Sequence, residues 1–457
     1  MIKRGVGFLE SRLGSSGLVK KTLDYVFPDH WSFLLGEIAL YCFLVLVATG
    51  IYLTLFFEPS YAHVVYHGDY VPLRGTEMTE AFRSTLDLSY RWKAGLLIRQ
   101  THHWAANVFI ASIVLHLFRI FLTGAFRKPR DINAWIGVTM LALAVVEGYA
   151  GYSLPDDLLS GMGLAIGYSV ALSVPVIGAW LGTGIWGGQF PGGEVFIDRL
   201  FIVHVLIIPV AIGGLIAVHL AVIMRQKHSQ FRGPGRTERN VVGLRLWPAY
   251  AFRSIGLMLA VTGVLFLLGG LIQINPIWQW GPFEPYRATN GAQPDWYLGW
   301  LLGALRLMPG WELHAGGYTV LPNPFFGGLL FPLACFSLLY LWPWLERRRT
   351  GDDTRHDLLD APSDAPRRTG AICAFASLVG VVFLTGSADR IAVQIHVSYV
   401  TQIWIMRVLL FVLPPIVYLV VKAMCLELQE RRRVEPGEPE PGAAAALGGG
   451  SPGEPSP

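Results

Sequence analysis

The chain has 457 residues, of which 53% are hydrophobic and only 15% charged, and its mean hydropathy is +0.46. Soluble globular proteins carry roughly a quarter charged residues, so the composition excludes an ordinary soluble enzyme and indicates a polytopic membrane protein. The net charge of +4 does not indicate nucleic-acid binding, because the basic residues stand in short clusters between apolar runs.

Eight runs are long and apolar enough to cross about 30 Å of hydrocarbon, which takes roughly 20 helical residues each. In chain order, the predicted spans A to H cover residues 33–56, 95–122, 135–152, 200–224, 254–275, 326–345, 370–387 and 402–425. We therefore predict an all-α polytopic transmembrane fold, with spans A–D as a four-helix bundle and spans E–H as C-terminal helices.

Lys and Arg gather in alternate connections, whereas residues 152–198 contain neither. The basic connections lie within residues 3–21, 127–130, 225–245, 347–368 and 431–433. By the positive-inside rule, both termini are expected in the cytoplasm, with the chain in the plasma membrane.

Span B carries histidine at both ends of HHWAANVFIASIVLH. His102 and His116 are 14 residues apart, about 21 Å of helix rise and within about 40° of one face. His204 and His219 form a similar pair on span D. They are 15 residues apart, which is about 22 Å of helix rise and about 60° of rotation around the helix axis. Spans B and D cross in the same direction, so His102 is level with His204 and His116 with His219. Two such levels predict two six-coordinate haems, with no open position on the iron, which suits electron transfer.

An alternative for each histidine is a hydrogen-bonded core residue or a step in a proton path. Two pairs at matching depth favour haem ligation. His103 could replace His102 as the partner of His204, but it points about 100° away.

Two arginines accompany the histidines on span B. Arg99 lies three residues before His102 and Arg119 three after His116, so each shares its histidine's helical face and could pair with haem propionates. The alternative is that both simply extend to the membrane surface.

Glycines repeat the 14-residue spacing on the neighbouring spans. Gly36 and Gly50 stand on span A, and Gly137 and Gly151 on span C. Glycine lets a flat macrocycle approach a helix closely, although glycine in membrane helices also serves ordinary helix packing.

Together these residues resemble cytochrome b of the quinol:cytochrome c reductase (cytochrome bc) family, from about residue 27 to about 426. The resemblance is carried by LLGEIALYCFLVLVATG, IRQTHHWAANVFIASIVLHLFR, GAFRKPR, GYAGYSLP, the His204–His219 segment and QPDWY. It implies that His102 and His204 bind a low-potential haem b near the outer face. His116 and His219 would bind a high-potential haem b near the inner face.

GYSLP and the spacing on span D are similar to the chloroplast type, but that type is split after four spans and this chain is continuous. Leu34 also replaces the cysteine that tethers an extra haem there. The combination resembles an actinobacterial subunit. It implies a Rieske iron-sulfur partner, a c-type cytochrome, a terminal oxidase, a dimeric complex and menaquinone as the quinone.

QPDWY, residues 293–297, resembles the family's quinol-oxidation motif, with Asp295 in place of the usual Glu. A carboxylate beside the quinol can accept a proton, whereas read alone Asp295 is also a plausible helix cap. The resemblance assigns Tyr297 and Tyr152 to the same site. It adds three pocket residues, which are Pro294, Trp296 and Gly163.

No single motif in the sequence defines the inner quinone site. Ser254 stands where the mitochondrial pattern has Asp, and a solvated basic loop is the simpler interpretation of residues 227 and 228. Glu147 is an intramembrane acid that could serve a proton path or bond a neighbouring helix. The candidates for the inner site are Lys227, His228, Glu37 and Arg253.

The predicted organisation has five parts. They are a cytoplasmic segment (1–30), the di-haem bundle (31–225), a cytoplasmic loop (226–253), a C-terminal domain with the PDWY loop (254–426) and a disordered tail (427–457). The resemblance implies a proton-motive Q-cycle, in which quinol is oxidised outside and quinone reduced inside. The rival interpretations are a di-haem anchor of another dehydrogenase and a proton-coupled transporter.

Overall fold

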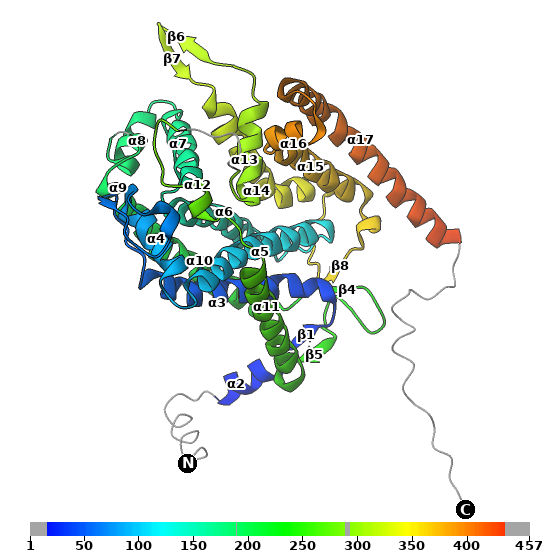
Figure 1. The fold of residues 1–457 in the computed structure, drawn as a ribbon. Coiled ribbons are helices and arrows are strands. Elements are labelled where there is room, and N and C mark those ends of the chain that lie inside the picture. The colour runs from blue at the N-terminus through cyan, green and yellow to red at the C-terminus, as the bar shows by residue number, and fades with distance from the viewer. Residues whose placement is uncertain (1–15, 189, 288–292, 435–457) are drawn as a thin grey trace, which may run out of the picture.

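The computed structural model describes residues 16–434 except residue 189 and residues 288–292 (Figure 1). Within this part, eight helical stretches are long and apolar enough to cross a membrane, which confirms the predicted number of spans. Their bounds are Trp31–Thr54, Gly95–Leu122, Asp131–Ser153, Glu194–Gln226, Leu246–Leu271, Phe325–Thr350, Pro366–Thr385 and Tyr399–Val434. The principal helices of these stretches are α3 (Leu34–Thr54), α5 (Gly95–Leu122), α6 (Asp131–Ser153), α10 (Ile208–Gln226), α11 (Ala251–Leu271), α14 (Phe331–Thr350), α15 (Pro366–Thr385) and α17 (Tyr399–Val434).

Several helices end away from their predicted bounds. The last one, α17, continues to Val434, so residues 427–434 are helical rather than part of a disordered tail. Their sequence, ELQERRRV, consists largely of good helix formers, which lets the helix extend past the hydrocarbon. Residues 435–457 lie outside the described residues. Span E ends early, at Leu271, because Ile272 is extended and Asn275 precedes a proline.

Span D is a composite. It begins with α9 (Glu194–Ile202), passes through one π turn, η3 (Val203–Ile207), and continues as α10. Further turns, η4 (Leu246–Tyr250) and η5 (Phe325–Leu330), lead into α11 and α14.

The connections hold short elements that the all-α prediction did not include. Within the described residues, four two-stranded sheets pair β1 with β5, β2 with β3, β4 with β8 and β6 with β7, and of these pairs β4 with β8 is the parallel one. The strands are Val26–Pro28, His63–Val65, Glu77–Thr79, Gln230–Phe231, Gly243–Arg245, Leu313–Ala315, Tyr318–Leu321 and Leu358–Leu359, for β1 to β8. The short helices are α2 (Ser16–Leu23), α4 (Glu80–Tyr90), α7 (Leu158–Leu172), α8 (Gly178–Trp186), α12 (Ile277–Trp280), α13 (Trp296–Leu307) and α16 (Ala388–Ile395).

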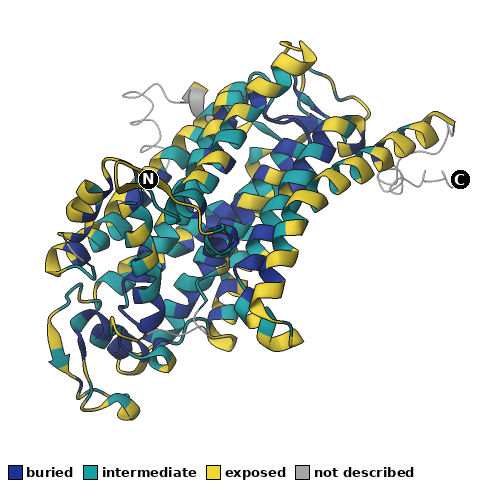
Figure 2. Ribbon diagram, turned by 90° about the horizontal axis from the view of Figure 1, so that it is seen from above, coloured by how far each residue is buried: buried dark blue, intermediate teal, exposed yellow. Residues whose placement is uncertain are grey.

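The main core lies where α3, α5, α6 and α10 meet. Cys42, Ala105, Val138 and Ile212 are at most 1% exposed there. By contrast, α17 exposes apolar residues along its length, among them Val408, Phe411 and Leu419, and Figure 2 colours this helix largely as exposed or intermediate. Such a surface is expected of a helix that faces lipid. We call the face formed by residues 127–130, 225–245 and 347–368 the basic face.

Candidate haem and quinol sites

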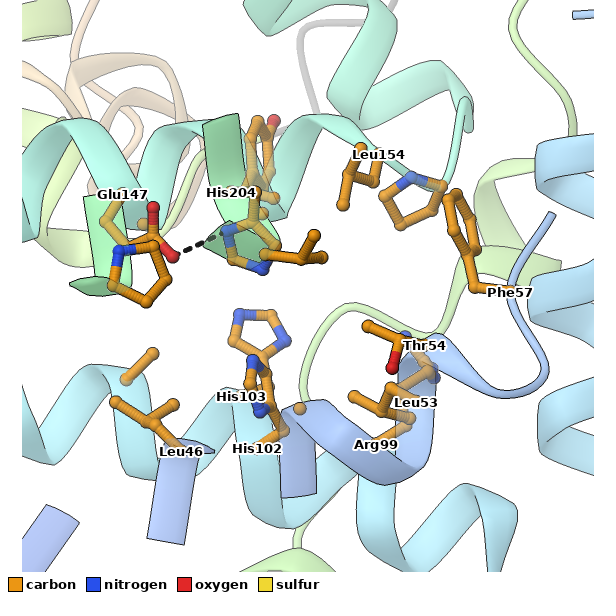
Figure 3. A pocket seen from close by; sticks show the side chains of 18 of the residues that line it. Leu46, Leu53, Thr54, Phe57, Arg99, His102, His103, Glu147, Leu154 and His204 are labelled. Carbon is orange, nitrogen blue, oxygen red and sulfur yellow. Dashed lines mark ion pairs between the residues drawn. The ribbon is translucent and has the colours of Figure 1, made fainter. Parts of the chain in front are cut away.

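The imidazoles of His102 and His204 face one another across the bundle. His102 comes from α5 and His204 from the π turn, and their ring centroids lie 6.2 Å apart at 79°. Figure 3 shows the histidines of the two elements pointing toward one another from opposite walls. A metal–imidazole bond is about 2 Å long, so this separation fits one metal atom between the two rings.

The π turn explains how span D reaches this geometry with a spacing of 15 residues. A π turn takes up one more residue than an α-helical turn. Because η3 contains His204, the extra residue between His204 and His219 does not displace their imidazoles by a full helical step. Periodicity alone could not reveal the turn.

Each imidazole at this level has an oxygen atom 2.9 Å from its Nδ1. The Thr49 hydroxyl lies 2.9 Å from His102 Nδ1 and donates to the Val45 carbonyl at 2.6 Å, so it can accept from an Nδ1–H. His204 Nδ1 lies 2.9 Å from Glu147 Oε1 (Figure 3). Partners of this kind orient an imidazole and leave its Nε2 to bind a metal. The sequence had indicated Glu147 but not Thr49, whose only signal is its place beside Gly50.

His116 and His219 form the second level, nearer the basic face. The two imidazoles are close enough to interact electrostatically. His116 Nδ1 is buried and has no hydrogen-bond partner among the described residues. The structure therefore places His102 opposite His204, and His116 within electrostatic range of His219.

Three of the four predicted glycines lie directly against these imidazoles. A Cβ on Gly36 would lie 3.3 Å from His116 Cε1, and one on Gly50 would lie 3.4 Å from His102 Cε1. A Cβ on Gly151 would lie 2.9 Å from His204 Nε2, with Cε1 closer still. Gly137 differs, since its Cβ would meet Leu117 at 3.4 Å and no histidine.

Arg99 and Arg119 give the clearest indication that the site fits an anionic group. In each, Nε and Nη2 are buried without a hydrogen-bond partner among the described residues. Buried guanidinium donors without hydrogen-bond acceptors are costly, so both positions fit an anionic group such as a propionate. Arg119 stacks over Phe33 at 4.2 Å and is only 9% exposed, which does not fit an arginine that extends to the surface.

Asp295 stands at the start of α13, where a helix-capping role was the alternative interpretation. Its side chain makes no capping hydrogen bond. Instead, Asp295 Oδ2 lies 2.6 Å from His103 Nε2 and accepts from the Tyr297 hydroxyl at 3.1 Å, while Oδ1 accepts from Asn275 at 3.2 Å. Burial raises the pKa of this carboxyl, but His103 and the two hydrogen bonds outweigh it, so the pKa lies below its ordinary value.

Two side chains of α5 hold the segment that carries Asn275. Gln100 bonds both the carbonyl and the amide of Ile274, at 3.0 and 2.9 Å, and Trp104 donates to the Ile272 carbonyl at 2.8 Å. His103, which the sequence left as an alternative to His102, thus lies in the Asp295 cluster. Helix α5, which carries His102, therefore also positions the QPDWY motif.

One cavity of about 600 Å³ joins the two clusters. Its wall includes His102, His204, Asp295, Tyr297 and Tyr152. The cavity thus places a carboxylate and two phenols beside the His102–His204 pair. Among the predicted pocket residues, Pro294, Trp296 and Gly163 do not line it; Trp296 is exposed, and a Cβ on Gly163 would meet Tyr152.

The inner-site candidates differ in their burial and in their partners. Ser254 donates to Glu37 at 2.9 Å, and Tyr250 donates to the same carboxylate at 2.5 Å. Lys227 is exposed, but His228 is not part of a solvated loop.

His228 packs beside Phe27, with ring centroids 4.9 Å apart, and its Nε2 has no partner among the described residues. Burial, with the charges of Arg130 and Arg119, lowers its pKa to about 3. Arg253 pairs with Asp29. Glu37 and Arg253 thus both lie beside Tyr250, whereas Lys227 is exposed.

Eight spans around paired intramembrane histidines define an integral membrane redox protein. A family model described as cytochrome b(N-terminal)/b6/petB matches residues 107–282. The cytochrome bc1 complex cytochrome b subunit of Mycobacterium bovis is 48% identical over 93% of this chain and 77% of its own length. The corresponding subunits of Corynebacterium efficiens and Streptomyces coelicolor are 47% and 44% identical, over 93% and 94% of this chain and 78% of their own lengths. The chain belongs to this family, the cytochrome b subunits of the bc1 complex.

A solved structure of a hyperthermophilic respiratory Complex III shares the fold. The match has a TM-score of 0.64 at 19% identity and covers 92% of this chain and all of that one. These findings confirm the resemblance to the cytochrome b family and its actinobacterial character. Membership implies haem b and a multi-subunit complex, and it disfavours both rival interpretations, the dehydrogenase anchor and the transporter.

Proposed function

We propose that this subunit of quinol:cytochrome c reductase oxidises quinol in the cavity beside Asp295 and holds two haems b, one at each histidine level. In this way it contributes to a proton-motive Q-cycle. The observation that carries the proposal is the single cavity that places Asp295, Tyr297 and Tyr152 beside the His102–His204 pair.

The described residues fit the group that the family implies. His102 with His204, and His116 with His219, would supply the nitrogen ligands, and Arg99 and Arg119 would neutralise propionates. When bound between two imidazoles, a haem iron supplies electron transfer without an open coordination position. Gly36, Gly50 and Gly151 keep the helix backbones close to the ligand rings.

Asp295 prepares the quinol pocket for proton release. Its ionised carboxylate is an acceptor-only group, so it can take a hydrogen bond and then a proton from a quinol hydroxyl. His103, Tyr297 and Asn275 hold the carboxylate in place, which limits the motion needed when quinol binds.

The orientation in the membrane is inferred from the Lys and Arg clusters, and the quinone and the partners from the family. The Lys and Arg clusters favour a cytoplasmic basic face in the plasma membrane, with both termini on that side. Kinship with actinobacterial bc1 subunits supports menaquinone as the quinone and a dimeric complex. It also supports a Rieske iron-sulfur subunit, a c-type cytochrome and a terminal oxidase as partners.

The test uses two single variants in the purified complex. His102→Ala should remove one b-type signal in a redox titration followed by absorption, and His116→Ala should remove the other. His63→Ala is the matched control, because His63 is an exposed histidine of β2 that pairs with Glu77. Survival of both signals in His102→Ala would overturn the assignment of that histidine.

A further inference from the structure

A second cavity, of about 1180 Å³, lies on the basic face. It is framed by the ends of α14, α15 and α17 and by the connection between α5 and α6, including Arg127 and Lys128. None of the four paired histidines lines it, nor does Asp295. It is therefore separate from the redox sites.

The charge of the wall is strongly positive. Eight Lys and Arg side chains face five Asp and Glu side chains. Three of these cations pair with carboxylates of the wall. Arg368 pairs with Glu346 at 2.8 Å and with Asp360 at 2.7 Å, Arg127 pairs with Asp360 at 3.0 Å, and Arg347 pairs with Asp131 at 3.8 Å. Four cations have no carboxylate partner among the described residues, and they are Arg348, Arg349, Arg367 and Lys422.

These four cations come from three helices. Arg348 and Arg349 stand near the end of α14, where Arg348 also stacks on Trp344 at 5.2 Å. Arg367 begins α15, and Lys422 lies on the part of α17 that is still apolar. The cations thus surround the cavity at the level where the spans leave the hydrocarbon.

The deeper wall is apolar. Trp342, Pro343 and Leu345 contribute from α14, Ala371 from α15 and Leu426 from α17. These residues belong to membrane-spanning helices, so the apolar wall is continuous with the hydrocarbon region. A cationic rim above an apolar wall matches the chemistry of a phospholipid, which has an anionic head group and acyl chains.

We propose that this cavity binds an anionic phospholipid of the adjacent leaflet, with its phosphate among Arg348, Arg367 and Lys422 and its acyl chains along Trp342 and Leu426. Basic pockets between spans on the cytoplasmic side are known to take such head groups. A free phosphate would leave the apolar wall uncovered, and the cavity exceeds the upper end of the roughly 300–1,000 Å³ range of small-molecule pockets. The bound lipid would link the ends of α14, α15 and α17.

The test compares two double variants of the purified complex after delipidation. Arg367→Gln with Lys422→Gln removes two cavity cations, whereas Arg239→Gln with Arg433→Gln removes two exposed cations outside the cavity. Bound phosphatidylglycerol is counted by native mass spectrometry during a lipid titration. Each cation near an anionic surface contributes about fivefold, so we expect roughly 30-fold weaker binding in the cavity variant and little change in the control.

Further arms separate the sources of the anion. Arg367→Lys with Lys422→Arg keeps the charge and should keep phosphatidylglycerol binding, which would rule out misfolding as the cause of the loss. Phosphatidylcholine should not occupy the site, and inorganic phosphate should not displace the lipid. Equal weakening in the control pair, or displacement by inorganic phosphate, would overturn the proposal.

Discussion

The substitution Gly151→Ala tests whether His204 is held by a metal. The added Cβ would lie 2.9 Å from His204 Nε2, whereas ordinary contact begins at 3.4 Å, so the ring must retreat by about 0.5 Å at this atom and further at Cε1. A free imidazole could turn away at little cost, because it is the far end of a flexible side chain. An imidazole bound to iron on one side and held near Glu147 on the other cannot.

Overpacking of a fixed site costs about 1–3 kcal/mol, so we expect roughly 5- to 150-fold weaker retention of one haem in Gly151→Ala. The assay is the reduced-minus-oxidised absorption of the purified complex, followed during a redox titration. Gly50→Ala is the control, since its Cβ would make only ordinary contact with His102. If Gly151→Ala and Gly50→Ala have the same haem content and the same midpoints, then His204 is not held in place by a metal and the reasoning is refuted.

Three further substitutions have defined outcomes. Asp295→Asn should slow quinol oxidation roughly 100-fold while leaving both b-type spectra intact, and an unchanged rate would remove its proton role. Thr49→Val removes the partner of His102 Nδ1, so retention of one haem should weaken roughly tenfold; equal weakening of both would contradict the pairing.

Burial, opposed by the hydrogen bond from Thr79, raises the pKa of Asp156 to about 7. In the unfolded chain this carboxyl has a pKa of about 4. The folded state therefore loses stability as the pH rises from the unfolded pKa to the folded pKa, by at most about 4 kcal/mol. Asp156→Asn should therefore raise the melting temperature relative to the natural chain at pH 8 but not at pH 4. An equal difference at both values would contradict the shifted pKa.

The spans and the histidine levels could be predicted because both depend on local periodicity. An apolar run of about 20 residues must be helical in lipid, and a spacing of 14 residues returns a helix to the same face. The partners of these residues could not be predicted in the same way. His103 and Asp295 are 192 positions apart, and their contact depends on how α5 holds the segment after α11.

Gly137 shows the limit of reasoning from spacing. It repeats the interval of Gly151, yet it packs against Leu117 and no histidine, whereas Gly36 and Gly50, at the same interval, each face an imidazole. The π turn at His204 is another feature of the folded chain, since it adjusts span D to meet its partner on α5.

The most direct measurement of the central claim is the number of haems b per chain in the purified complex, combined with a redox titration. A pyridine haemochrome assay set against the protein concentration should give two per chain, and the titration should resolve two midpoints. A count of one or none would contradict a path for electrons built from the pairs His102–His204 and His116–His219.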